Sequence, residues 1–143
     1  MKKGSTLVEA IISMSLLLIA LSITVQISTI ATKSIRIRKD REKANRVSYA
    51  IENEIKYNIS FTEIKNIFTN GNISLKYKDD ILDSLLNKSL LSLERGNEII
   101  IEKKVDNSVE SMYEISTFIV RIIDSKGGIL SEREFIKSYW MDI

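Results

Sequence analysis

An uncharged stretch of 23 residues near the N-terminus, residues 10–32, constrains the fold of this chain more than any other feature. A helix rises about 1.5 Å per residue, so this stretch forms a helix of about 34 Å and covers the roughly 30 Å hydrocarbon core of a bilayer. Gly and Pro, the two residues that break helices, do not occur between Ser5 and Asn70. The sequence therefore predicts a membrane-spanning helix that continues beyond the membrane into water.

The continuation of this helix is predicted to be amphipathic. Charged residues are frequent from Lys33 to Arg46. Apolar residues recur there at spacings of three, four and seven, at Ile37, Ala44, Val47, Ile51 and Ile55. Such a stripe is typical of a helix that packs one face on a core. A helix from about residue 5 to about residue 57 is about 80 Å long, and only its second half can pack against a head.

Residues 59–143 remain for a small head, and its first part predicts two short helices and a strand. Ser60 followed by Glu63 has the pattern of a capping box and predicts a short helix that ends at a turn at residues 70–72. Residues 73–77 alternate as a short strand does. Asp79 or Asp80 is then expected to cap a helix whose apolar residues extend to Leu91, and residues 95–97 close that element.

The last third of the chain predicts three strands in an antiparallel meander. Residues 98–105 are rich in Ile, residues 112–123 alternate in part, and residues 129–139 follow a turn at residues 124–128. One face of this sheet can bury the apolar stripe of the helix, which makes a two-layer arrangement. The predicted fold is α+β: a long N-terminal helix, half transmembrane and half amphipathic, packed on a small antiparallel sheet head.

Composition and charge exclude several functions. The formal net charge is only +2 and the basic residues do not interleave with aromatic ones, so no nucleic acid contact is expected. The absence of Cys and His removes thiol nucleophiles, disulfides, most transition-metal sites and the commonest general base. Two acidic pairs, Asp79 with Asp80 and Asp106 with Glu110, lack the ligand pattern of a calcium loop and are expected to be cap and turn residues. We expect neither an enzyme nor a cofactor.

The residues before the apolar run form a motif. Lys2, Lys3 and Gly4 precede Ser5, and Glu9 stands at the edge of the run. This resembles the prepilin signature of type IV pilins and pseudopilins, in which a membrane peptidase cuts after the Gly and usually methylates the new amino group. The resemblance implies cleavage between Gly4 and Ser5, N-methylation of Ser5, and a role for Glu9 as the assembly carboxylate.

Physical chemistry supports a special role for Glu9. An acid in an apolar span is costly, on the order of 3 kcal/mol for a central Asp and less near the interface. In a filament of parallel helices, the carboxylate of Glu9 can meet the free ammonium of Ser5 in a neighbouring subunit, and a low dielectric strengthens this pair. Because cleavage creates that ammonium, processing is expected to permit assembly.

The resemblance also implies an organisation, partners and a location. Residues 1–4 are the expected leader, 5–32 the transmembrane and assembly helix, 33–58 its amphipathic continuation and 59–143 the head. The implied partners are other pilin or pseudopilin subunits, prepilin peptidase, membrane lipid and, indirectly, an assembly platform protein with its ATPase. The chain is expected to cross the cytoplasmic membrane once, with its C-terminal head outside, and then to join a surface filament of a pilus, competence or secretion machine. Ser5 in place of Phe, and the absence of a helix Pro and of a disulfide loop, favour a minor pilin or a pseudopilin.

Two alternatives remain. A basic start followed by an apolar run is also typical of a secretory signal or signal anchor, although this run is longer than the about 7 to 15 residues of a signal core. If the run is a signal anchor, the chain is a membrane-anchored binding or sensor module that does not polymerise.

The second alternative concerns orientation. By the positive-inside rule, the basic residues after the span predict that the C-terminal part lies in the cytoplasm. They can equally meet lipid phosphates, acidic heads of neighbouring subunits, or solvent.

Overall fold

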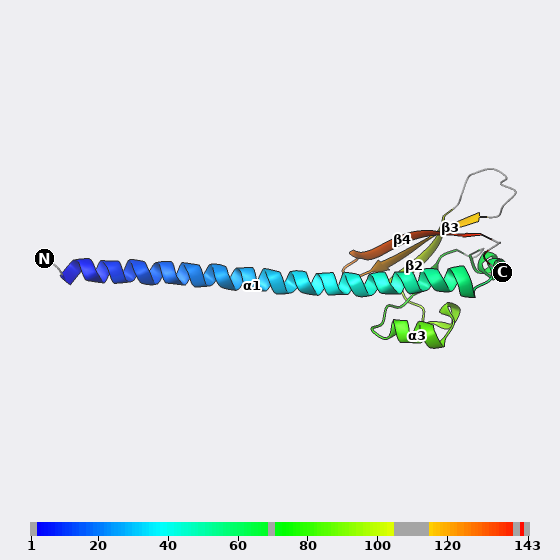
Figure 1. Cartoon of the computed structure of the whole chain (residues 1–143), viewed down its shortest axis with the longest axis horizontal. Helices are drawn as coiled ribbons and strands as arrows, with labels where there is room; N and C mark the ends of the chain where they lie inside the picture. The colour runs from blue at the N-terminus through cyan, green and yellow to red at the C-terminus, as the bar shows by residue number, and fades with distance from the viewer. Residues whose placement is uncertain (1–2, 69–70, 105–114, 139–140, 142–143) are drawn as a thin grey trace. The chain divides into compact units, whose positions relative to one another are not determined.

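The computed structural model of this chain describes residues 3–68, 71–104, 115–138 and 141, and the side chains from residue 6 onward. The chain divides into two compact units, residues 1–39 and 40–143. The first helix, α1 (Lys3–Asn53), runs through both units. Its last turns lie beside the strands of the head (Figure 1).

The first unit is a continuous exposed helix within the described residues. No break interrupts α1, as the absence of Gly and Pro predicts. Four hydroxyl groups within the apolar run bond to backbone carbonyls one turn earlier. Their donors are Ser15, Thr24, Thr29 and Thr32, at donor to acceptor distances of 2.8 to 2.9 Å. The helix therefore satisfies these side-chain donors without water.

The end of the long helix differs in detail from the predicted α-helix. After Asn53 the chain makes a π-helical turn, η1 (Glu54–Asn58), and then becomes extended at Ile59. The predicted end at about residue 57 is confirmed, but the last turn is wider than an α-helical turn. Helix ends leave carbonyl groups without intrahelical donors, and side chains near the turn or water can supply those donors.

The head contains a four-stranded antiparallel sheet in the order β1-β2-β3-β4. Its strands are β1 (Ile73–Leu75), β2 (Ile99–Lys104), β3 (Ile115–Ile123) and β4 (Ile129–Ser138). The predicted three-stranded meander is confirmed, and β1 extends it because Ile73 pairs with Ile101. A short strand carries too few residues for the sequence to show which neighbour it joins.

Two glycines permit the tight turns of this sheet. Gly127 has a φ of +81° in the β3–β4 hairpin, a conformation that other residues rarely adopt. Gly96 lies against the backbone that follows β1, where an added Cβ would come within 2.6 Å of the Cα atom of Lys76. Gly96 therefore allows this loop to run close beside the chain after β1.

One face of the sheet packs on the second half of α1. The predicted helix stripe is confirmed at its last four positions, Ala44, Val47, Ile51 and Ile55, which are buried. The sheet contributes the buried residues Ile73, Leu75, Ile99, Ile101, Phe118, Val120, Ile122 and Phe135. Ile37 was predicted to join the stripe, but it is 42% exposed and belongs to the first unit. The α+β arrangement, with a long N-terminal helix packed on an antiparallel sheet, is confirmed.

The short helices confirm part of the prediction for the head. The predicted cap of α2 (Phe61–Phe68) is present, because the Glu63 backbone N–H donates to Ser60 Oγ at 3.2 Å. Asp80 precedes α3 (Ile81–Asn87), but its side chain makes no capping hydrogen bond. The helix predicted to reach Leu91 ends at Asn87 and is followed by a 3-10 turn, η2 (Leu90–Ser92), which buries Leu90.

The acidic pairs considered as calcium ligands have different surroundings. Asp79 lies 3.5 Å from the Lys43 ammonium, and both side chains are exposed. Asp80 is the residue before α3. Asp106 and Glu110 lie outside the described residues. Within the described ranges, no group of three or more acidic side chains is placed to hold a metal ion.

Candidate functional site

The described residues of the N-terminal motif, from Lys3 to Glu9, lie on the first two turns of α1. Gly4 and Ser5 belong to the helix, and Glu9 is exposed one turn after Ser5. The apolar run begins directly after Glu9 on the same helix. The structure thus places the motif at the start of an unbroken helix, and the predicted roles in cleavage, methylation and assembly remain predictions.

The apolar run exposes its side chains on every side. Its large exposed residues are Ile11, Ile12, Met14, Leu16, Leu17, Leu18, Ile19, Leu21, Ile23, Val25, Ile27 and Ile30. Each of these side chains is at least half exposed. Soluble monomers rarely expose contiguous apolar patches larger than a few hundred Å². By length and composition this helix can cross a membrane, which suits either a membrane anchor or a signal sequence.

A second set of residues attaches the head to the second half of α1. Alternate residues of β4 (Ser131, Arg133, Phe135 and Lys137) share the face of the sheet that packs on the helix, because side chains alternate along a strand. Ser131 Oγ donates to Asn45 Oδ1 at 2.7 Å and accepts from Ser48 Oγ at 3.0 Å. These contacts join strand and helix residues more than 80 positions apart in the sequence.

Glu52 lies at the middle of this attachment. It is buried and accepts hydrogen bonds from Lys56, at 2.6 Å, and from Arg133. Burial opposes ionisation, but the hydrogen bonds and positive charges of Lys56 and Arg133 outweigh it and lower the pKa of Glu52 below its ordinary value. The Arg133 guanidinium also lies 5.2 Å from the centre of the Tyr49 ring. Helix and strand therefore share an ionic cluster.

This cluster predicts a pH dependence of stability. Because the pKa of Glu52 is lower in the folded state, its contribution is complete above its ordinary value of 4.5 and is lost as the pH falls through the folded pKa. We expect the urea midpoint of the full chain in detergent to fall between about pH 6 and about pH 3. Glu52→Gln should reduce that fall, whereas Glu63→Gln, which changes an exposed acid on α2, should keep the wild-type fall. Equal pH dependence of E52Q and the wild type would contradict this prediction.

Lys137 supplies the partner that the wide last turn of the helix needs. Its side chain is fully buried, and its ammonium donates to the carbonyl oxygens of Lys56, at 3.0 Å, and Ile59, at 2.5 Å. Cations at a helix C-terminus bind the free carbonyls and the negative end of the helix dipole. Lys137 thus holds the end of the long helix against the last strand of the sheet.

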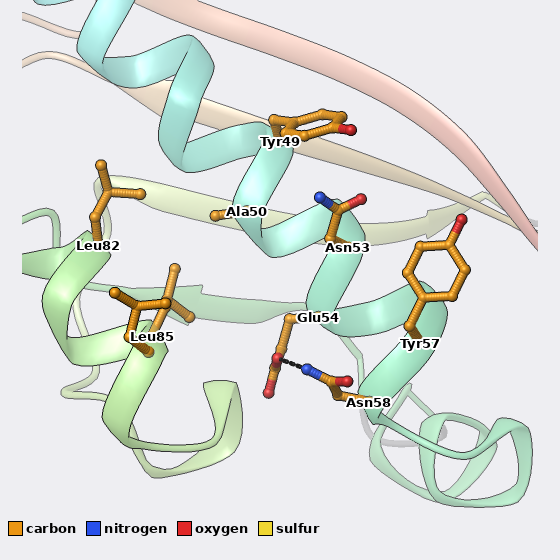
Figure 2. A pocket seen from close by; sticks show the side chains of 9 residues that line it. Tyr49, Ala50, Asn53, Glu54, Tyr57, Asn58, Leu82 and Leu85 are labelled. Atoms are coloured by element: carbon orange, nitrogen blue, oxygen red, sulfur yellow. Dashed lines mark hydrogen bonds between the residues drawn. The ribbon is translucent and has the colours of Figure 1, made fainter.

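An open groove lies between the end of α1 and α3 (Figure 2). Its volume is about 660 Å³, and its lining residues are Tyr49, Ala50, Asn53, Glu54, Tyr57, Asn58, Leu82, Leu85 and Leu86. Leu82 and Leu85 project from α3 on one side, and Tyr49 and Tyr57 stand on the other. Asn58 Nδ2 donates to Glu54 Oε2 at 2.5 Å. The lining offers apolar surface, phenols and amides, which suit binding by contact and hydrogen bonding.

The sequence did not predict the polar contacts of β4. Ser, Arg and Lys on a strand most often face solvent, and their partners on α1 are distant in sequence. One signal was present: Ser131, Arg133 and Lys137 alternate along the strand with the same parity as the apolar Phe135. The opposite face carries Leu130 and Ile136 as well as Glu132 and Glu134. Because both faces mix apolar and charged residues, alternation alone could not choose between them.

Comparisons with protein-family models, with curated proteins and with solved structures found no match for this chain. A long apolar N-terminal helix is followed by a small head, in which four antiparallel strands pack on the second half of that helix. This architecture is pilin-like.

Proposed function

We propose that this chain is a structural, non-enzymatic subunit of a filament, a minor pilin or a pseudopilin of a type IV pilus, competence or type II secretion-like machine. One observation carries the proposal. An unbroken helix bears Gly4, Ser5 and Glu9 ahead of an apolar run whose large side chains are at least half exposed, and the head is folded on the same helix beyond that run.

The proposed subunit has two environments in turn. Before assembly the apolar run lies in the cytoplasmic membrane, with the head outside. After cleavage between Gly4 and Ser5, the apolar runs of neighbouring subunits cover one another and replace the lipid. The carboxylate of Glu9 then pairs with the Ser5 ammonium of a neighbour, so that neither charge stays unpaired in an apolar environment.

The attachment of the head suits this role. A subunit pulled from the membrane into a filament must carry its head with it. The contacts of Glu52 with Arg133, and of Lys137 with the end of the helix, join the last strand of the chain to its first helix. Helix and head are thereby linked by polar contacts, buried at Lys137 and partly buried at Arg133, in addition to apolar packing.

The partners of this proposal follow from its steps. Prepilin peptidase performs the cleavage and the N-methylation of Ser5, and other pilin or pseudopilin subunits provide the neighbouring helices. An assembly platform protein with its ATPase drives extraction from the membrane. No cofactor is required for any of these steps.

Mass spectrometry of the mature protein from its native cell tests this proposal. We expect the chain to begin at Ser5, with a methyl group on its amino nitrogen, and to retain the apolar run. A mature form that keeps residues 1–4, or that begins after residue 32, would overturn the proposal. A reporter fused after Ile143 provides a second test, because its location in the cytoplasm would also exclude a surface filament.

A second function, a membrane-anchored binding module that does not polymerise, is favoured by the groove between α1 and α3. The groove presents Tyr49, Tyr57 and Leu86, which are 53%, 71% and 83% exposed. Such a module needs no cleavage after Gly4 and no carboxylate at position 9. If this alternative holds, we expect the mature protein to retain residues 1–4. We also expect the variant Glu9→Val to function normally.

A further inference from the structure

Four basic residues directly follow the apolar run on the exposed part of α1. Lys33, Arg36, Arg38 and Lys39 lie within seven positions that contain no acidic residue. All four side chains are exposed. Among the residues that the structure describes, none of the four lies within ion-pair distance of a carboxylate. We call these four residues the basic collar, and no carboxylate of the described residues neutralises their charges.

The collar surrounds the helix. Successive residues of an α-helix are rotated by about 100°, which places Arg38, Lys39 and Arg36 at about 140°, 240° and 300° from Lys33. The largest angular gap between neighbouring charges is therefore about 140°, and no face of the helix is without a nearby cation. A protein partner docks on one side of a helix, so a stripe of charge along that side gives it the most ionic contacts. A headgroup layer encloses a helix on all sides, so a ring of charge gives it the most ionic contacts.

The position of the collar along the helix also matches a headgroup layer. The apolar run of about 34 Å spans the roughly 30 Å hydrocarbon core with slight tilt. The collar then occupies about 9 Å along the axis, comparable with the roughly 5 to 8 Å of polar layer on each side of the core. Ile35 and Ile37 stand between the charges, which is typical of an interfacial segment. Lys and Arg side chains extend toward phosphates while their stems stay in apolar surroundings.

We propose that the basic collar binds the phosphate groups of anionic phospholipids in the leaflet next to the head, and thereby holds the unassembled subunit at a fixed depth. The site selects anionic over zwitterionic lipid, because only the anionic headgroup leaves a net negative charge to neutralise the collar. This lipid contact depends on neither the cleavage after Gly4 nor the carboxylate of Glu9.

Lipid competition on the full chain tests the inference. Purified protein in neutral detergent is mixed with equal amounts of phosphatidylglycerol and phosphatidylcholine, and retained lipids are counted by native mass spectrometry. We expect preferential retention of phosphatidylglycerol, which weakens as salt is raised. The collar variant K33Q/R36Q/R38Q/K39Q should lose this preference by about tenfold or more. The matched control K88Q/R95Q/K103Q/K126Q removes four exposed charges from the head and should retain the preference for phosphatidylglycerol.

Three results would overturn the inference. The wild type could retain both lipids equally, the collar variant could keep its preference, or the head control could lose it to the same degree. Loss of subunit-to-subunit cross-linking in the collar variant, with lipid preference unchanged, would instead assign the collar to the acidic surface of a neighbouring subunit. Hydrogen exchange of β2 to β4 in each variant checks that the head is folded. Because the assay uses no filament, failure of the pilin proposal leaves its outcome unaffected.

Discussion

The variant Glu9→Val should remain in the membrane at the wild-type level and should fail to enter a filament. Valine removes the one charge at the edge of the apolar run, so insertion into lipid becomes easier. In the filament, however, the Ser5 ammonium of a neighbour loses its partner and stays in an apolar environment. A single unpaired charge of this kind typically costs about 3 to 5 kcal/mol, and it recurs at every subunit contact.

Two fractions of the same cells measure this effect. Shearing separates surface filaments from the membrane pool, and immunodetection with an antibody against the head quantifies the subunit in each. We expect the amount of E9V in the sheared fraction to be at least about a hundredfold lower than that of the wild type, consistent with the cost of an unpaired charge. Asp83→Asn, which removes an exposed acid from α3, is the matched control and should assemble normally. Wild-type assembly of E9V would contradict the charge pair and favour the anchored binding module.

Lys137→Met should lower the free energy of unfolding of the head by about 3 kcal/mol. Methionine has nearly the length and volume of the lysine side chain, so the cavity term stays small. The substitution leaves the carbonyl oxygens of Lys56 and Ile59 without this donor. Hydrogen bonds from a charged donor contribute about 1.5 to 3 kcal/mol each, and unsatisfied buried acceptors add about 1 to 3 kcal/mol. The total free energy of unfolding of a native domain is only about 5 to 15 kcal/mol, so this loss is a large share of it.

Urea denaturation of the full chain in detergent, followed by near-UV circular dichroism, measures the loss. Lys103→Met is the matched control, because Lys103 is an exposed lysine on β2 and should change stability by less than about 0.5 kcal/mol. Hydrogen exchange should also become faster at residues 54–59 in K137M. If K137M is as stable as the control and residues 54–59 exchange at the wild-type rate, Lys137 does not hold the end of the helix.

The elements that were predicted well depend on short-range patterns. Ala44, Val47, Ile51 and Ile55 are buried as their spacing indicates, because helical periodicity alone decides which residues share a face. The cap at Ser60 was predictable for the same reason, since its partner Glu63 is three residues away. The long apolar helix was likewise predicted from adjacent residues, because they contain neither charges nor helix breakers.

The predictions that failed concern residues whose structure depends on distant contacts. Asp80 precedes α3 without the expected capping bond, and α3 ends at Asn87, ahead of the predicted end at Leu91. The burial of Leu90 in η2 favours a 3-10 turn over a continued helix. Ile37 has the right spacing for the stripe but is exposed, because packing on the sheet begins farther along the helix.

Local sequence patterns predicted a long helix that begins near residue 5, a first half of that helix that is apolar on all sides, and an antiparallel sheet after it. These properties arise from composition, periodicity and the absence of helix breakers over neighbouring residues. Three features came from tertiary contacts: β1 joins the sheet, Glu52 accepts a hydrogen bond from Arg133, and Lys137 binds the carbonyl groups at the end of the helix. Those contacts depend on the register of strands and on partners about 30 to 80 residues apart, which no local pattern specifies.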